Sequence, residues 1–81
     1  MSSPSLQPFT VFGFATTHDA LSAESALIDA QVPVRVIPVP KALGSLCGLA
    51  LRVPQAVEVR ACDVLIASAI VATGQASVRD R

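Results

Sequence analysis

The residue of this chain with the most evident chemistry is Cys47, which is followed by Gly48 and stands between two apolar, strand-like runs. A thiolate is a nucleophile, but a thiol with an ordinary pKa of about 8.5 is mostly protonated at pH 7. Lys41 and Arg52 flank the cysteine in sequence, and a nearby cation would favour the anion. Gly48 would let another molecule approach the sulfur without a side chain in the way. Cys47 is therefore a candidate reactive thiol; the alternative interpretation is an unreactive, buried cysteine.

The loop that carries Cys47 has its own conformational signals. Residues 38–52 hold two of the six prolines and two of the four glycines of the chain. Gly44 and Ser45 suit a tight turn that could direct backbone N–H groups toward the sulfur. We therefore expect Ser45, Leu46 and Gly48 to shape the loop and Lys41 and Arg52 to stabilise the anion.

Two further residues have polar or reactive side chains, but the sequence gives less support for a functional role of either. Cys62 lies among Val59, Leu65 and Ile66 in a helical segment, so packing is its favoured role. His18 falls in the first turn of a predicted helix, where a solvated or capping role is favoured over a general base. A strand-to-helix corner is nevertheless a common functional position, so His18 is kept as a candidate binding residue.

The sequence lacks the usual sets of catalytic and cofactor-binding residues. It has no Ser-His-Asp set, P-loop or dinucleotide fingerprint, and its two cysteines are fifteen residues apart without metal-ligand spacing. One histidine gives little support for zinc. We therefore expect no metal and no cofactor, and carrier-type thiol chemistry at most rather than an enzyme.

Composition excludes several classes of function. The chain has 81 residues, 52% hydrophobic and 15% charged, which is too apolar for disorder and fits one small domain. Its formal net charge is zero, and it has no basic cluster, Trp or Tyr, so nucleic-acid binding is not expected. The longest uncharged apolar run, 64–72, is far shorter than the roughly 20 residues a bilayer requires. The start of the chain does not resemble a signal peptide, so we expect a cytoplasmic protein with free thiols.

The pattern along the chain predicts a flexible tail over residues 1–8 and a single domain over 9–81. Residues 9–14 are aromatic and β-branched and predict a strand. A helix is predicted next, with Thr16 as its cap, Asp19 as a short capping-box acid, an apolar pattern along 20–31 and Pro33 as its stop. Its apolar face holds Ala20, Ala23, Leu27 and Ala30, and Leu21 and Ile28 widen that face.

The second half predicts strands over 34–40 and 48–53, a helix from Pro54 to about Thr73 that stops at Gly74, and a last strand over 76–79. The order strand, helix, strand, strand, helix, strand predicts an α+β, ferredoxin-like βαββαβ sandwich, with a four-stranded antiparallel sheet and both helices on one face. Pro38 cannot donate a ladder hydrogen bond, which predicts an edge position for the second strand, as this topology requires.

The predicted second helix is apolar nearly all round, with Val59, Ile66 and Ile70 on its far side. A small domain can bury one side of such a helix. The pattern leaves two interpretations open: tolerated surface residues, or a homodimer or partner contact through this helix or the open sheet face.

Three segments, TTHDALSAE at 16–24, VPVRVIPVP at 32–40 and CGLALR at 47–52, match a known family in order and spacing. Over about residues 9–71 the chain resembles the small bacterial family catalogued as DUF3343 and described as selenium/sulfur carrier protein-like. The resemblance implies that Cys47 holds sulfur or selenium as a persulfide or selenosulfide and delivers it to an acceptor enzyme. A donor protein would load it.

Two alternatives use the same residues differently. One is a ferredoxin-like binding or regulatory module that dimerises and senses a ligand or redox state. The other is a plain interaction subunit in which Cys47 is incidental and the apolar second helix is the contact surface.

Overall fold

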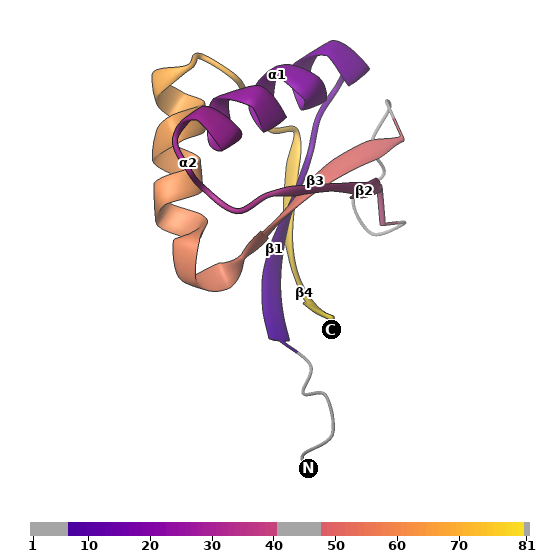
Figure 1. The fold of residues 1–81 in the computed structure, drawn as a ribbon. Coiled ribbons are helices and arrows are strands. Elements are labelled where there is room, and N and C mark those ends of the chain that lie inside the picture. The colour runs from indigo at the N-terminus through magenta and orange to yellow at the C-terminus, as the bar shows by residue number, and fades with distance from the viewer. Residues whose placement is uncertain (1–6, 41–47, 81) are drawn as a thin grey trace.

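A computed structural model describes residues 7–40 and 48–80, with the backbone alone at residue 80. Within these ranges the chain forms β1 (Gln7–Gly13), α1 (Thr17–Asp29), β2 (Arg35–Pro38), β3 (Leu49–Pro54), the short 3₁₀ helix η2 (Gln55–Val57), α2 (Glu58–Ala67) and β4 (Gly74–Asp80). Figure 1 shows the two helices together on one side of the sheet. Residues 41–47 and most of the tail predicted at 1–8 lie outside the described ranges; Gln7 and Pro8 belong to β1.

The four strands form one antiparallel sheet in the order β2-β3-β1-β4. This order and the element sequence define an α+β, ferredoxin-like fold, which confirms the predicted fold class. β2 is an edge strand and ends at Pro38, as predicted from the missing N–H of proline. β4 forms the other edge and is longer than predicted, because Gly74 and Gln75 already pair with the end of β1.

The register divides the sheet into a helix face and an outer face. Phe12 pairs with Leu51 and Gln75 on the helix face, whereas Val11 pairs with Arg52 and Ala76 on the outer face. The helices pack on the first of these faces. The buried core there contains Phe12, Phe14, Ala20, Ala23, Leu27, Val32, Leu51, Val53, Ala61 and Leu65.

Helix α1 begins as the sequence predicts. The Asp19 N–H donates to Thr16 Oγ1 at 3.0 Å, so the Thr16 side chain accepts from the third residue of the helix. Ala20, Ala23 and Leu27 are buried, and the small side chains of the two alanines let the helix lie close to the sheet. Leu21 and Ile28 are exposed, so the prediction that they widen the buried face was wrong.

Both helices end in the same way, without a glycine. The N–H of Val32 donates to the Leu27 carbonyl, and the N–H of Ile70 donates to the Leu65 carbonyl, which are the long bonds of Schellman motifs. The residues in the left-handed conformation are Gln31 at φ 60° and Ala69 at φ 57°. The prediction that the second helix continues to Thr73 and stops at Gly74 was therefore wrong. Burial of Leu65 and contact of Ile70 with the core fix the helix end instead.

Candidate functional site: the β2–β3 hairpin

The candidate thiol is carried by the connection between β2 and β3. Cys47, Ser45, Leu46 and Lys41 lie outside the described residues, so the roles predicted for them stay predictions. The base of the connection is described: Pro38 is paired with Leu49, and the Val39 N–H donates to the Gly48 carbonyl at 3.0 Å. β2 and β3 therefore hold the residue that follows Cys47 at one end of the sheet.

Gly48 has a backbone conformation that other residues rarely adopt. Its φ is +77°, and among the described residues other than its chain neighbours a Cβ built at this position would meet no atom within 4 Å. The residue is exposed. The backbone angle is therefore the described feature that favours glycine here. The predicted role of Gly48 in leaving access to Cys47 stays a prediction.

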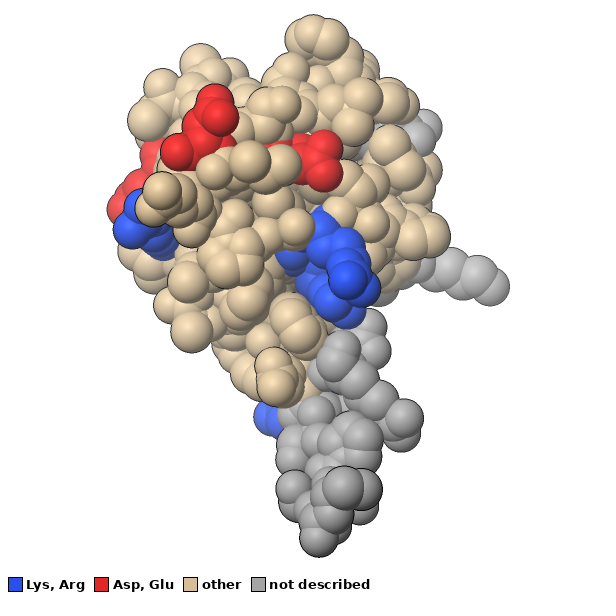
Figure 2. All heavy atoms as spheres, viewed as in Figure 1, with Lys and Arg blue, Asp and Glu red and all other residues tan. Residues whose placement is uncertain are grey.

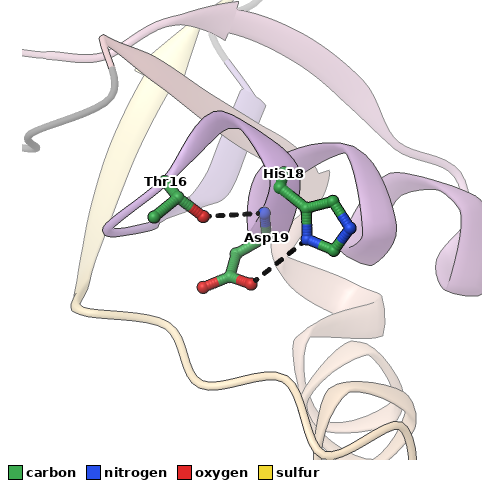
Figure 3. A network of polar contacts seen from close by, with 3 residues as sticks. All are labelled: Thr16, His18 and Asp19. Carbon is green, nitrogen blue, oxygen red and sulfur yellow. Dashed lines mark hydrogen bonds and ion pairs between the residues drawn. The ribbon is translucent and has the colours of Figure 1, made fainter.

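The start of α1 lies at the same end of the sheet as the hairpin base. β1 ends at Gly13, which pairs with Ala50 near the beginning of β3, and the chain then turns into the helix capped by Thr16. His18 is 89% exposed at its side chain, and its Nδ1 lies 3.9 Å from Asp19 Oδ1 (Figure 3). His18 is thus a solvated residue at this end, which leaves its imidazole available to an incoming molecule.

Arg52 lies away from the hairpin base. It is four residues beyond Gly48 on β3, which corresponds to about 13 Å along an extended strand. Its guanidinium carbon is 4.2 Å from the centroid of the Phe9 ring. Phe9 pairs with Pro54, at the end of β3 opposite Gly48. Arg52 therefore makes a cation–π interaction at the far end of the strand.

Cys62 is half-buried on α2 and packs against the core, as its apolar neighbours predict. It lines a hollow of about 240 Å³ together with side chains that are mainly apolar: Phe12, Leu65, Ile66, Ile70, Val71, Ala72 and Gln75. Burial raises the pKa of its thiol, and the carboxylates of Glu58 and Asp63 raise it further. Cys62 is accordingly held in the protonated, less nucleophilic form.

Two further classes of site are absent from the described part of the chain. Residues 7–40 and 48–80 contain no group of three or more His, Cys, Asp or Glu side chains that could hold a metal ion. None of the helices in these ranges is long and apolar enough to cross a membrane.

One family model matches the sequence of this chain. The model of the family described as "Putative Se/S carrier protein-like" matches residues 10–74, which include Cys47, Gly48 and His18. The match covers most of the chain, so the protein belongs to this family. Comparison with curated proteins gave no match, and comparison with solved structures gave none either.

Proposed function

We propose that this protein is a sulfur or selenium carrier that holds the chalcogen on Cys47 as a persulfide or selenosulfide. The observation that carries the proposal is the family match, which spans the CG pair at 47–48. The exposed, left-handed Gly48 at the hairpin base supports it, because the residue that follows Cys47 has no side chain and is open to solvent. His18 at the same end supports it as a residue that contacts the donor or acceptor.

The transfer needs no resident cofactor and no net oxidation. The Cys47 thiolate attacks the terminal sulfur of a donor persulfide, a new S–S bond forms, and the donor cysteine leaves as a thiolate with the electron pair. An acceptor thiolate then attacks the terminal sulfur on Cys47 and releases the Cys47 thiolate. A selenosulfide reacts in the same way, with selenium as the transferred atom. The protein acts in this scheme as a carrier between two partner proteins and not as an enzyme.

Intact-protein mass spectrometry tests the proposal directly. Wild type, Cys47→Ser and Cys62→Ser are incubated with a low-molecular-weight persulfide and then with an acceptor thiol. We expect a gain of one sulfur atom in wild type and Cys62→Ser, its loss after the acceptor is added, and no gain in Cys47→Ser. An adduct that persists in Cys47→Ser, or none in any protein, would contradict the proposal.

A second candidate function is that of an interaction module, and the exposed apolar residues of α2 favour it. Val59 is 74% exposed and Ile66 is 75% exposed, one heptad apart on the same helix, and Val71 is equally exposed just beyond it. Large exposed apolar side chains that gather on one side are typical of contact surfaces. If this surface makes a homodimer, sedimentation velocity will show a concentration-dependent dimer that Cys47→Ser retains and Ile66→Glu loses. A monomer at all concentrations would remove this candidate.

A further inference from the structure

The two edge strands of the sheet differ in length and in protection against pairing with another chain. β2 has four residues and ends at Pro38, and Pro33 lies shortly before it. A short edge strand with prolines is a poor template for a further strand. β4 has seven residues, Gly74–Asp80, and contains neither proline nor lysine. It is therefore the edge at which the sheet can be extended.

β4 is regular over its whole length. All seven residues pair with β1 in one continuous register, from Gly74 opposite Gly13 to Asp80 opposite Gln7, so the strand has no bulge. Within residues 7–40 and 48–80, β1 is the one strand that pairs with β4. The backbone of such an edge directs a row of N–H and C=O groups away from the sheet. These groups match the acceptors and donors of another regular strand.

The side chains of β4 form a symmetric pattern about Ser77, the middle residue of the strand. Gln75, Ser77 and Arg79 are polar and exposed, and they lie on the helix face of the sheet. Ala76 and Val78 are apolar and half-buried, and they lie on the outer face. The pattern is therefore the same in both directions along the strand. An antiparallel contact between two identical strands requires such a self-complementary pattern.

We propose that β4 pairs antiparallel with β4 of a second copy of this chain, about a two-fold axis at Ser77. Among the registers that keep like faces together, this one pairs all seven residues of the strand. It places Ala76 opposite Val78 of the second copy and Gln75 opposite Arg79 of the second copy. Side chains in directly opposed positions interact, and like charges there are destabilising. No like charges oppose each other in this register.

The charge of the chain also favours contact between two copies. The formal net charge is zero, so two copies do not repel each other as whole molecules. The two charged residues of β4, Arg79 and Asp80, have opposite signs. On the face shown in Figure 2, most of the surface belongs to residues other than Lys, Arg, Asp and Glu. Electrostatic repulsion, which keeps many exposed edges apart, is therefore weak here.

The proposed contact is separate from the hairpin that bears the candidate thiol. Gly74 pairs with Gly13, which also pairs with Ala50 near the start of β3, so this end of β4 lies at the hairpin end of the sheet. Antiparallel pairing of two copies therefore places their hairpin bases at opposite ends of the combined sheet. The contact is also distinct from one through the exposed side of α2, because backbone groups of β4 form it.

Disulfide cross-linking tests the pairing and its register. Ser77→Cys and Gln75→Cys are each introduced into the full-length Cys47→Ser/Cys62→Ser chain and oxidised with glutathione disulfide. At the proposed axis the two Ser77 positions are directly opposed, close to the Cβ separation that a disulfide requires. The two Gln75 positions are four residues apart along the strands, or about 13 Å. We expect Ser77→Cys to cross-link about tenfold faster or more. Comparable rates, or no cross-link in Ser77→Cys, would overturn the proposal.

Sedimentation velocity provides the second test. We expect a concentration-dependent dimer in wild type and a dissociation constant about fivefold higher in Ser77→Lys, because two ammonium groups then oppose each other at the axis. Ser25→Lys adds the same charge at an exposed position of α1 and should leave the dimer unchanged, as should Ile66→Glu on α2. A monomer at all concentrations, equal weakening in the two lysine variants, or loss of the dimer in Ile66→Glu would overturn the proposal.

Discussion

The two ends of β3 differ in what they offer to another molecule. At the hairpin end, Gly48 has no side chain, a left-handed backbone and an exposed position. At the opposite end, Arg52 lies over Phe9, faces Arg35 and lines a hollow with two prolines. The first end is defined by its backbone conformation, and the second by large charged and aromatic side chains. One rigid strand can therefore hold two separate surfaces about 13 Å apart.

The largest expected effect is confined to the hairpin end. Cys47→Ser should abolish chalcogen loading completely, whereas Arg52→Gln at the opposite end should leave loading within about twofold of wild type, because distant sites behave independently. Intact-mass spectrometry measures loading in both variants. Loss of loading in Arg52→Gln would show that the two ends are coupled.

Leu51→Ala should destabilise the whole fold and, with it, both ends of β3. Leu51 is fully buried at the centre of β3, between the hairpin base and Arg52, and contacts the helix-face core. Truncation of such a side chain leaves a cavity and costs about 2–5 kcal/mol of the free energy of unfolding. Urea denaturation measures this loss. Leu21→Ala on the exposed side of α1 is the matched control, with an expected change within about 0.5 kcal/mol.

Gly48→Ala tests the backbone of the hairpin end. A Cβ meets no atom at this position, so the left-handed φ alone should cost about 1–2 kcal/mol of the free energy of unfolding. Gly13→Ala is not a matched control, because Gly13 is buried within β1. Ala69→Gly is a better comparison, since Ala69 already has a positive φ, and glycine there should stabilise the fold by about 0.5–1 kcal/mol. Urea denaturation would show opposite signs for the two substitutions.

The two cysteines should differ in their reaction with iodoacetamide. Burial and the nearby Glu58 and Asp63 raise the pKa of Cys62, so its alkylation should become fast only at a higher pH than that of a free thiol. A raised pKa also means that the folded state retains the Cys62 proton when the unfolded state has lost it. The contribution to stability is therefore complete below the unfolded-state pKa and falls as pH rises through the folded-state pKa. Rate–pH profiles of Cys47→Ser and Cys62→Ser measure each thiol alone, and equal profiles would contradict this difference.

The smallest expected effect is on the free energy of unfolding and comes from the end of β3 that carries Arg52. Arg35→Gln removes a like charge opposite Arg52 and should raise the free energy of unfolding by about 0.2–1 kcal/mol at low salt. The gain should shrink as salt increases, because exposed charges are screened. Urea denaturation at two salt concentrations measures it. A loss of stability in Arg35→Gln would mean that Arg35 makes favourable contacts that outweigh the repulsion.

Local signals in the sequence were sufficient to predict the order of the helices and strands. Thr16 and Asp19 predicted the start of α1, because capping involves residues three apart in the chain. Pro38 predicted an edge strand, because a missing N–H acts at the residue itself. The CG pair at 47–48, together with two other segments, pointed to the family that the match over 10–74 then showed. Each of these predictions rests on a neighbour within a few residues or on a family pattern.

Other features depended on partners that are distant in the chain. The sequence placed Arg52 near Cys47, whereas the fold places its guanidinium on Phe9, 43 residues earlier, and opposite Arg35. A net charge of zero gave no indication of where charged residues meet, such as Arg35 and Arg52 in opposed positions on β2 and β3. The end of α2 was predicted from Gly74, but contacts of Leu65 and Ile70 with the core ended the helix at Ala67.

The sequence by itself thus determined which segments are helices and strands, where α1 begins, and which strand lies at an edge. The tertiary structure decided where the helices end and which side chains meet across the sheet. The physical reason is the distance along the chain over which each interaction acts. Caps, prolines and alternating patterns act over a few residues, whereas strand register and core packing join residues whose positions in the chain do not reveal their proximity.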